Sequence, residues 1–583
     1  MQQSKMSMMS ILLAAFIIFS SFWLLLKKKK KTKKNLPPEV GGSRPLFGHL
    51  HLMRGAKHPH RVLSDLADTY GPIFTIKLGR YRAVVVSDSE TAKECFTTND
   101  LAFASRPDMV YIQVLGYQNS NFAFVEYADF WRQMKKKITI DILSNHRLLQ
   151  FKELRESEIN NGLRTLRKFW EQQKGTSGTV DVDLKRWLHD VTNNFNMKII
   201  FGKAAGYATG EDAGKLMARW RTCCAEFAAL FGKIVVADLV PFLRRFDIWN
   251  DERTMKLALK SVDDILHQWL IEHKQTNVTE GGDFMHLLIK SIENSEVNIE
   301  GRDPDTVIKA TCVGLLIAAS DTTANTMTWA LASLLTNPHT LKKLREEIDE
   351  QMGRDRKVSE SDTKNMEYLN AVIKETLRLY PAAPLSIDHF STEDCQVAGY
   401  EVPANTIIIP NMWRIQRDRK VSESDTKNME YLNAVIKETL RLYPAAPLSI
   451  DHFSTEDCQV AGYEVPANTI IIPNMWRIQR DPRVWESPEE FIPERFLTKH
   501  KDVDVRGQNF ELIPFGSGRR MCPGINFAMQ IVKLTLVSLL HEFEIEPCGD
   551  IDRTERVGGL ASPMVAPLNV SLSPRLPPHF YNY

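Results

Sequence analysis

The sequence lacks a marked excess of charge of either sign. Its 583 residues include 74 lysines and arginines and 72 aspartates and glutamates, which leaves a formal net charge of +2. Proteins that bind nucleic acid or a strongly acidic partner usually carry a clear basic excess. The balance of charge therefore supports neither class of partner.

A disulfide framework is also missing. The eight cysteines are scattered without regular spacing, at positions 95, 223, 224, 312, 395, 458, 522 and 548. Small secreted domains that depend on disulfides carry denser and more regular cysteines. A reducing compartment is the simpler interpretation of this pattern.

A dinucleotide-binding motif is absent as well. No G-x-G-x-x-G segment lies between a predicted strand and a predicted helix, where such a loop would hold a pyrophosphate. The sequence therefore gives no sign that the chain itself binds a dinucleotide.

Charged residues are also absent from Ile11 to Leu26, which is an apolar run. Together with the residues just before it, this run approaches the roughly 20 residues needed to cross a bilayer. A lysine-rich block, Lys27–Lys34, follows it, whereas a cleavable signal peptide carries its basic residues in front. The positive-inside rule then keeps the rest of the chain in the cytosol. We expect a membrane anchor with its basic flank at 1–34 and a proline-rich hinge at 35–50.

Residues 51–583 are predicted to form one mainly α-helical domain with small β-sheets. Short β-rich segments at 73–78 and 83–86 come first, and helical periodicity then extends to about residue 380. The longest predicted helix, Thr306–Leu335, would span about 45 Å at 1.5 Å per residue and ends before Asn337-Pro338. Its polar residues argue against a second membrane span: Ser320, Asp321, Thr322 and Thr323.

The chain contains two identical copies of one segment. Arg354–Asp418 is the same, residue for residue, as Arg417–Asp481, so units 354–416 and 417–479 form a tandem repeat with a period of 63 residues. A solenoid needs at least about three units with atypical ends. Two identical copies are typical of a segment inserted twice, as a gene-model artefact or a very recent duplication. We expect one copy to occupy the core and the other to lie as a poorly packed insertion.

One cysteine lies in a glycine-rich loop that precedes an apolar, helical-looking stretch at 525–540, and the loop reads Phe515-Gly516-Ser517-Gly518-Arg519-Arg520-Met521-Cys522-Pro523-Gly524. Cysteine binds metals as the thiolate, which a helix N-terminus and nearby guanidinium groups stabilise. The nearest other cysteines, Cys458 and Cys548, are too distant in sequence to indicate a four-ligand zinc site. A single thiolate suits the fifth ligand of a haem iron. The alternative is a buried structural cysteine.

This loop resembles the haem-binding signature F-x-x-G-x-R-x-C-x-G of the cytochrome P-450 family, and the anchor and hinge resemble those of its microsomal members. The resemblance implies the cytochrome P-450 fold, mainly α with small β-sheets, and haem with Cys522 as the iron ligand. It implies a monooxygenase in the endoplasmic reticulum membrane, with its catalytic domain facing the cytosol. Dioxygen, a small hydrophobic substrate and NADPH-cytochrome reductase are the implied partners.

Further residues are assigned to the cofactor by the same resemblance. Trp131-Arg132-Gln133-Met134-Lys135 is similar to the W-x-x-x-R segment, whose basic residue meets a haem propionate. Lysine replaces arginine at 135, which keeps the charge but loses the bidentate fork, and Arg132 could share the task. The alternative is an exposed basic helix face that continues into Lys136-Lys137.

The signature loop contributes Phe515, Arg520 and Gly524 to the expected cofactor site. Arg520 and His452, with its duplicate His389, are further propionate candidates by their motif positions.

The long predicted helix carries Ala318-Ala319-Ser320-Asp321-Thr322-Thr323, which resembles the oxygen-activation motif [A/G]-G-x-[D/E]-T-[T/S]. The resemblance implies that Asp321 and Thr322 deliver protons to bound dioxygen. Ala319 stands where the family usually has glycine, which eases local unwinding of the helix. The alternative is a threonine hydroxyl that bonds back to the preceding turn.

A structural cluster behind the haem is expected from the E-x-x-R and P-E-R-F segments. These supply Glu438, Arg441 and Arg495, with Glu375 and Arg378 of the first copy as the alternative to Glu438 and Arg441. Glu and Arg three apart on a helix are neighbours and can pair.

Segments such as Pro37-Pro38-Glu39-Val40-Gly41-Gly42 resemble a plant group that oxidises specialised metabolites. Flavonoid hydroxylation is the first expectation, with hydroxylation or demethylation of an alkaloid, furanocoumarin or terpenoid as alternatives. Two rivals remain: rearrangement of an oxygenated substrate without a reductase, and an inactive membrane-anchored product in which the duplication disrupts the haem pocket. Family positions place the substrate at 103–124, 218–235, the long helix, 445–450 and 559–562.

Overall fold

The structure is a computed structural model. It describes residues 35–53, 58–79, 81–204, 215–233, 235–239, 244–245, 247, 250–276, 282–352, 358–363, 369, 373, 376, 387–392, 395–397, 400–403, 406–410, 441, 450–454, 457–467, 469–490, 492–496, 499–500, 503–556 and 563–576. The predicted membrane anchor, 1–34, lies outside the described residues.

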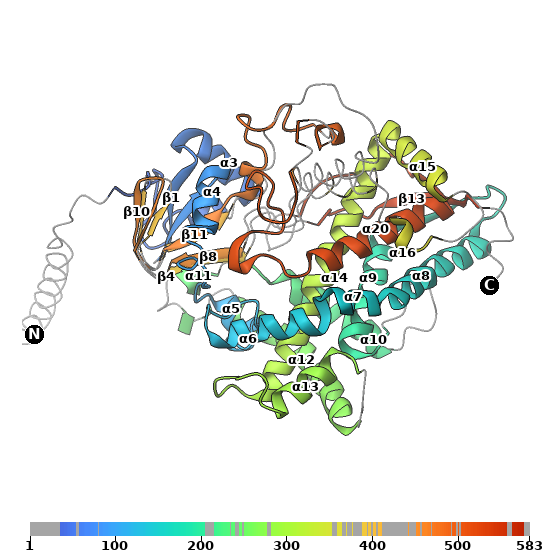
Figure 1. Ribbon diagram of the computed structural model, residues 1–583, viewed down its shortest axis with the longest axis horizontal. Helices are drawn as coiled ribbons and strands as arrows, with labels where there is room; N and C mark the ends of the chain where they lie inside the picture. Colours follow the sequence, from blue (N-terminus) through green and yellow to red (C-terminus); the bar gives the residue numbers. More distant parts are fainter. Residues whose placement is uncertain are drawn as a thin grey trace, which may run out of the picture.

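The longest described helix, α14 (Pro304–Thr336), crosses the molecule (Figure 1). The Asp303 carboxylate caps it by accepting a hydrogen bond from the Thr306 amide at 2.8 Å, and Pro304 fits the first turn because no helical partner awaits its missing amide. Among the described residues it is the one helix long and apolar enough to cross a membrane, but 61% of its most apolar window is buried. The prediction of a long core helix is confirmed.

Other helices pack around α14. Its most extensive contact is with α9 (Leu184–Phe201), followed by α20 (Ile525–Glu542), while α13 (Phe284–Glu293) and α12 (Asp251–Gln275) lie against it further along. Apolar side chains of α14 and α20 share one buried cluster, which fixes the cysteine loop in front of α20 relative to α14.

The remaining described helices lie around this core or along its edges. They are α2 (Leu50–Met53), α3 (Pro59–Tyr70), α4 (Ser89–Phe96), α5 (Val110–Leu115), α6 (Asp129–Ile138), α7 (Asn145–Gln150), α8 (Lys152–Gln173), α10 (Lys215–Ala229), α11 (Val236–Leu239), α15 (Pro338–Met352), α16 (Glu360–Thr363), α19 (Met475–Ile478), the π-helix η1 (Thr139–Leu143) and the short 3-10 helices η3 (Pro493–Phe496) and η4 (Gly518–Arg520).

Small sheets complete the fold. A six-stranded sheet has the order β1 (Ile73–Leu78), β2 (Tyr81–Val86), β11 (Ile470–Pro473), β8 (Ile450–Ser454), β4 (Ile387–Thr392) and β7 (Thr406–Pro410). A four-stranded sheet contains β10 (Tyr463–Val465), β9 (Cys458–Val460), β6 (Tyr400–Val402) and β5 (Cys395–Val397), and a three-stranded sheet contains β12 (Phe543–Pro547), β13 (Asn569–Pro574) and β3 (Val180–Asp183). The expected fold class, mainly α with small sheets, is confirmed.

Both copies of the repeat contribute strands to the same sheets. β11 pairs with β2 through Ile470 opposite Ala83, and β7 pairs with the same strand through Thr406 opposite Arg82. Thr406 is the counterpart of Thr469, so the two copies approach β2 in the same register. The expectation of a poorly packed insertion rested on the helix of each copy, and most of both helices lies outside the described residues; the strands of both copies pair within the same sheet. Identical strands present identical backbone edges and side-chain faces, so a sheet that accepts one can accept the other.

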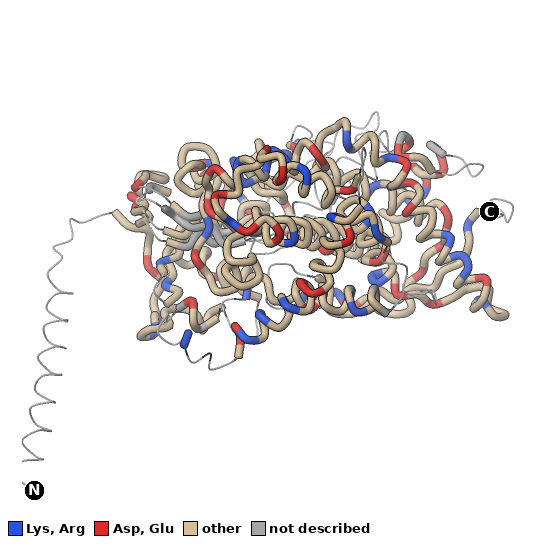
Figure 2. Tube along the Cα trace, turned by 90° about the horizontal axis from the view of Figure 1, so that it is seen from below, with Lys and Arg blue, Asp and Glu red and all other residues tan. Residues whose placement is uncertain are grey.

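Charged residues of both signs are interspersed along the chain trace (Figure 2). This distribution agrees with the balanced composition.

Candidate active site

The loop that carries Cys522 is held by its own backbone and by a distant carboxylate. The Cys522 amide donates to the Phe515 carbonyl at 2.9 Å. Asp100 accepts from the Arg519 amide at 2.9 Å and from the Arg519 guanidinium at 2.6 Å. Gly518 permits this approach, because its φ of 69° is left-handed and a Cβ there would collide with the Asp100 carboxylate.

Asp100 was not predicted from the sequence. It lies more than 400 positions before its partner in the chain, and an isolated aspartate carries no motif that could have identified it.

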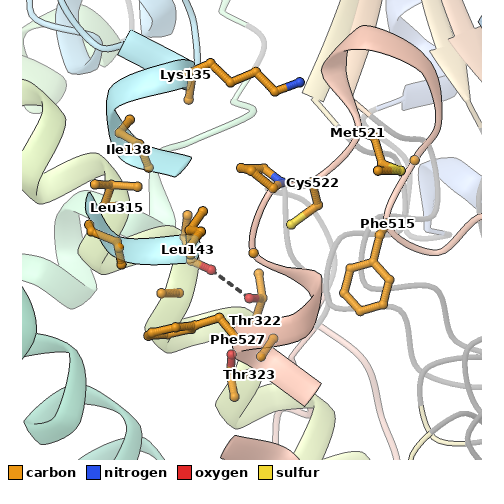
Figure 3. Close-up of a pocket in the computed structure, with 18 of the residues that line it drawn as sticks. Lys135, Ile138, Leu143, Leu315, Thr322, Thr323, Phe515, Met521, Cys522 and Phe527 are labelled. Carbon is orange, nitrogen blue, oxygen red and sulfur yellow. Dashed lines mark hydrogen bonds between the residues drawn. The ribbon is translucent and has the colours of Figure 1, made fainter. Parts of the chain in front are cut away.

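Cys522 faces a cavity of about 330 Å³ between α14, α9, α6 and the start of α20 (Figure 3). Most of the lining is apolar, and the side chains from α9 and the π-helix that follows α6 had no sequence signal. They are Ile142, Leu143, Asn196, Ile199 and Ile200. Burial raises the pKa of the Cys522 thiol, against the opposing effects of the Gly524 amide and the Lys135 ammonium.

Basic side chains gather at one side of this otherwise apolar cavity. Arg520 donates to the carbonyls of Ala104 and Val125, each at 2.6 Å, while its Nη1 is buried with no hydrogen-bond partner among the described residues. Burial, together with the nearby Arg106, holds the pKa of Arg520 well below its usual range. The cavity therefore contains a desolvated cation whose third donor can bind an anion.

Lys135 and Trp131 line the same side of the cavity. The Lys135 ammonium donates to the Arg519 carbonyl at 2.6 Å and lies 5.0 Å from the centre of the Trp131 ring, over which Arg520 also lies at 4.3 Å. Burial lowers the pKa of Lys135, chiefly by desolvation and then by repulsion from Arg520. Two cations and one aromatic ring thus form a compact group.

Arg132 does not belong to this group. It lies on the exposed face of α6 and pairs with Asp129 at 2.7 Å. Residues 131 and 135 are one turn apart on the inner face of the helix, and residue 132 is rotated away from them. The sequence alone could not distinguish the two basic positions, because it does not show which side of α6 is turned toward the cavity.

His452 lines the cavity from β8, and its Nδ1 donates to the Phe103 carbonyl at 2.5 Å. Burial and the nearby Arg106 and Arg520 lower its pKa well below the usual range. Phe515 and Gly524 also line the cavity. Of the expected cofactor residues whose side chains the structure describes, all except Arg132 therefore lie at this cavity.

The motif on α14 is divided between two environments. Thr322 lines the cavity, and its hydroxyl donates to the Ala318 carbonyl at 2.6 Å, which is the back-bonded alternative considered from the sequence. Asp321 does not line the cavity, and its Oδ1 lies 3.8 Å from Nδ1 of His189 on α9. α14 is continuous through Ala319, which lines the cavity.

Two buried arginines converge on backbone carbonyls of residues 479–490. Arg441 donates to the carbonyls of Gln479 and Pro488 at 3.2 and 3.1 Å, and Arg495 donates to those of Glu486 and Ser487 at 2.6 and 3.1 Å. Both also reach the Glu490 carbonyl at 3.4 Å. Arg441 comes from the second copy of the repeat. Glu438, Glu375 and Arg378 lie outside the described residues.

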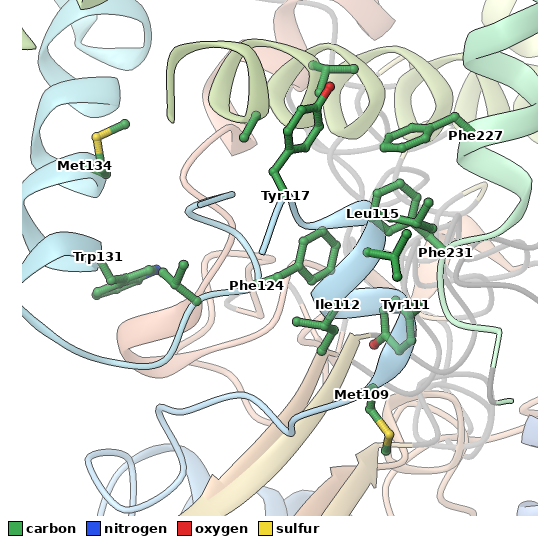
Figure 4. Packing of buried hydrophobic residues seen from close by; sticks show 14 of the residues in the cluster. Met109, Tyr111, Ile112, Leu115, Tyr117, Phe124, Trp131, Met134, Phe227 and Phe231 are labelled. Carbon is green, nitrogen blue, oxygen red and sulfur yellow. The ribbon is translucent and has the colours of Figure 1, made fainter. Parts of the chain in front are cut away.

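Part of the expected substrate region forms an aromatic cluster in the buried core next to the cavity lining (Figure 4). Phe124 stacks on Phe231 with ring centres 5.1 Å apart, and Tyr111 meets Phe124 edge-on at 6.2 Å. The neighbouring Phe122 and Ala123 line the cavity. Residues 445–449 and 559–562 lie outside the described residues.

Comparison with known proteins agrees with this arrangement. The family model described as Cytochrome P450 matches residues 37–422 and 415–564, in two segments that meet within the repeat. The chain is similar to strychnine-10-hydroxylase of Strychnos nux-vomica, with 39% identity over 94% of this chain and 93% of that protein. It is similar to flavonoid-6-hydroxylase of Ocimum basilicum, also 39% identical, over 94% and 92% of the two chains.

A third relative is xanthotoxin 5-hydroxylase of Arabidopsis thaliana, 39% identical over 92% of this chain and 93% of that protein. Among solved structures, a zebra fish cytochrome P-450 with progesterone shares the fold, with a TM-score of 0.65 at 22% identity over 89% of this chain and 99% of that one. Because the plant relatives match nearly the whole chain at this level of identity, the protein belongs to the cytochrome P-450 family and is a monooxygenase of that family.

Proposed function

We propose that the protein hydroxylates a hydrophobic plant specialised metabolite, with a flavonoid as the first candidate. The observation that carries this proposal is Cys522, the one thiol lining an apolar cavity that also contains buried cationic groups. Relatives that are 37–39% identical are named for hydroxylation of a flavonoid, alkaloids and a furanocoumarin. Electrons would come from NADPH through a separate reductase, at the endoplasmic reticulum membrane with the catalytic domain in the cytosol.

The residues around the cavity fit haem. Cys522 offers a thiolate ligand, and the unpartnered Nη1 of Arg520 is suited to a carboxylate such as a propionate. Lys135 and His452 lie on the same cavity, and Trp131 supplies a flat apolar surface beside them. When bound, haem would supply the activation of dioxygen.

The chain's own residues would then control binding, water and protons. The apolar side chains of α9 and α14 exclude water and leave room for a flat organic molecule. Thr322 would hold a proton at its hydroxyl oxygen within the cavity. Asp321 would act from outside the lining, beside His189, as a positioning group or a source of protons for Thr322.

The substrate can be tested with the full chain in yeast microsomes that contain a plant NADPH-cytochrome reductase. We expect a flavone to gain one oxygen atom, detected by mass spectrometry, and only when NADPH is present. Strychnine, protopine and xanthotoxin serve as the alternative substrates. Turnover of one of these alone would replace the flavonoid, and conversion of an oxygenated substrate without NADPH would favour the rearrangement.

The duplication leaves an inactive product as the second candidate. A reduced carbon monoxide difference spectrum of the expressed chain decides between the two, because a thiolate-type Soret band requires an intact haem site. Sequencing the transcript across codons 354–481 establishes whether the repeat is present. A variant without 354–416 is the matched control, and a band in that variant alone would support inactivation by the repeat.

Replacing Thr322 by alanine should lower product formed per NADPH consumed by at least about tenfold, because a positioned proton donor contributes about 10²–10⁴-fold and water can replace part of it. The ratio of product to NADPH measures this effect. Thr322→Ser keeps the hydroxyl and should retain most of the coupling. Equal loss in both variants would indicate that the methyl group, and not the hydroxyl, matters.

A further inference from the structure

A cluster of metal-ligating side chains lies away from the active-site cavity, where α12 meets the start of α13. His273 is in the last turn of α12, Asp283 caps α13, and His286 is in the first turn of that helix. Oδ2 of Asp283 lies 3.0 Å from Nε2 of His273 and 3.0 Å from Nδ1 of His286. The three side chains are only 5%, 9% and 14% exposed.

The hydrogen bonds of His273 determine which of its two ring nitrogens carries a proton in the absence of a metal. Nδ1 lies 2.6 Å from the Trp269 carbonyl, which can only accept, so Nδ1 carries a hydrogen. Nε2 must then carry a second proton or bind a metal ion to be stable beside a carboxylate. Metal-binding histidines usually donate their other nitrogen to a carbonyl or carboxylate in this way.

His286 and Asp283 are also oriented in advance. Oδ1 of Asp283 accepts the His286 amide at 3.1 Å as a helix cap, which leaves Oδ2 directed at the two imidazole rings. Nε2 of His286 is buried and has no hydrogen-bond partner among the described residues. A ring that binds a metal through Nδ1 carries its proton on Nε2, and Nε2 has no existing hydrogen bond among the described residues that this change would break.

The Asp283 carboxylate packs closely against Gly202 and lies beside a cavity. Gly202 ends α9 with a φ of 63°, and a Cβ there would come within 2.8 Å of Oδ2 of Asp283. A cavity of about 300 Å³ reaches Gly202, Gly282 and Asp283, and its lining also contains the charged residues Asp141, Arg147 and Lys198. Water can therefore approach the carboxylate and complete a coordination shell.

We propose that His273, Asp283 and His286 bind a divalent transition-metal ion, Zn²⁺ foremost, through Nε2, Oδ2 and Nδ1, with water as the fourth ligand. Ligands at about 2.0–2.1 Å around a tetrahedral zinc ion lie roughly 3.3 Å apart. Oδ2 of Asp283 is now 3.0 Å from each ring nitrogen and needs to separate from them only slightly, while the two ring nitrogens lie within 4.8 Å of each other. The ion displaces the proton that His273 carries on Nε2 to solvent, and the His286 proton moves from Nδ1 to Nε2. A metal ion bound by these three side chains would link the end of α12 to the start of α13.

A second cluster, His58, His60 and Glu555, is less suited to a cation. Arg61 already pairs with Glu555 at 2.8 Å and supplies positive charge at that carboxylate. This second cluster serves as a comparison for zinc binding within the same chain.

The test uses the full-length holoenzyme, treated with EDTA, dialysed against micromolar Zn²⁺ and analysed for zinc per haem. We expect one tightly held equivalent, together with a rise in melting temperature that EDTA reverses. Asp283→Asn keeps a good helix cap but removes the anionic ligand, and His286→Gln removes an imidazole. Each should weaken zinc binding by more than the roughly 10–100-fold typical of losing an outer-shell partner.

Two variants serve as controls. His267→Gln changes an exposed histidine of α12, and His60→Gln changes the second cluster, so both should retain the equivalent. The carbon monoxide difference spectrum of each variant reports whether its haem domain is folded, and His286→Gln decides if Asp283→Asn does not fold. Wild-type protein without a bound equivalent, or equal zinc in wild type, Asp283→Asn and His286→Gln, would overturn the proposal.

Discussion

Cys522→Ser is expected to abolish substrate oxygenation and to remove the thiolate-type Soret band of the reduced carbon monoxide complex. Cys522 is the single thiol among the residues that line the cavity, so no other sulfur in that lining can replace it. A serine hydroxyl at the same position is far less acidic than a thiol and does not supply the thiolate that distinguishes this haem class. The carbon monoxide difference spectrum and the oxygenated product measure the two effects.

Cys548→Ser is the matched control for this change. Cys548 is an exposed free thiol on β12's C-terminal side, away from the cavity lining, so its replacement should leave both readouts near wild type. A Cys522→Ser protein with an unchanged band would show that another group binds the iron and that the cysteine of the loop is structural.

Arg495→Leu should destabilise the haem domain by about 2–5 kcal/mol and sharply reduce the yield of holoenzyme. Arg495 is fully buried and donates to the carbonyls of Glu486 and Ser487. Each buried acceptor left without a donor costs about 1–3 kcal/mol. This is a large part of the roughly 5–15 kcal/mol that holds a typical domain together. Haem per milligram of protein and denaturant unfolding measure the loss.

Arg506→Leu is the comparison for Arg495. Arg506 is 66% exposed and pairs at 3.3 Å with the half-exposed Asp504, and such surface pairs contribute about 0–1 kcal/mol. Arg495 also lies outside the repeat, so no duplicate arginine can replace it. If the two variants were equally stable, the buried carbonyl contacts of Arg495 would not be what holds this segment.

Motifs with fixed spacing predicted those parts of the site whose residues lie close together in the sequence. The loop around Cys522, the length of α14 and the cavity positions of Lys135 and Arg520 could all be anticipated, because each depends on residues within one turn or one helix of one another. Asp100 and the α9 residues Ile199 and Ile200 could not, since they meet the loop only through the tertiary fold.

Helix orientation was the other source of error. The sequence offered Lys135 as the motif position and Arg132 as a residue that could share its task, and only the packing of α6 separates the exposed one from the one at the cavity. Thr322 both lines the cavity and makes the local back-bond, so a place at the cavity and the back-bond were not exclusive alternatives.

The shared register of β7 and β11 on β2 has a consequence for how this protein tolerates mutation. Two strands of identical sequence that can occupy one edge are energetically degenerate in their side-chain contacts, and only their connections to the rest of the chain distinguish them. A damaging substitution in one copy therefore lifts the degeneracy and favours the intact copy at that edge. As long as the copies remain identical, either β7 or β11 can pair with β2. A substitution confined to one of these two strands should therefore lower the free energy of unfolding less than a comparable substitution in β1, which has no second copy.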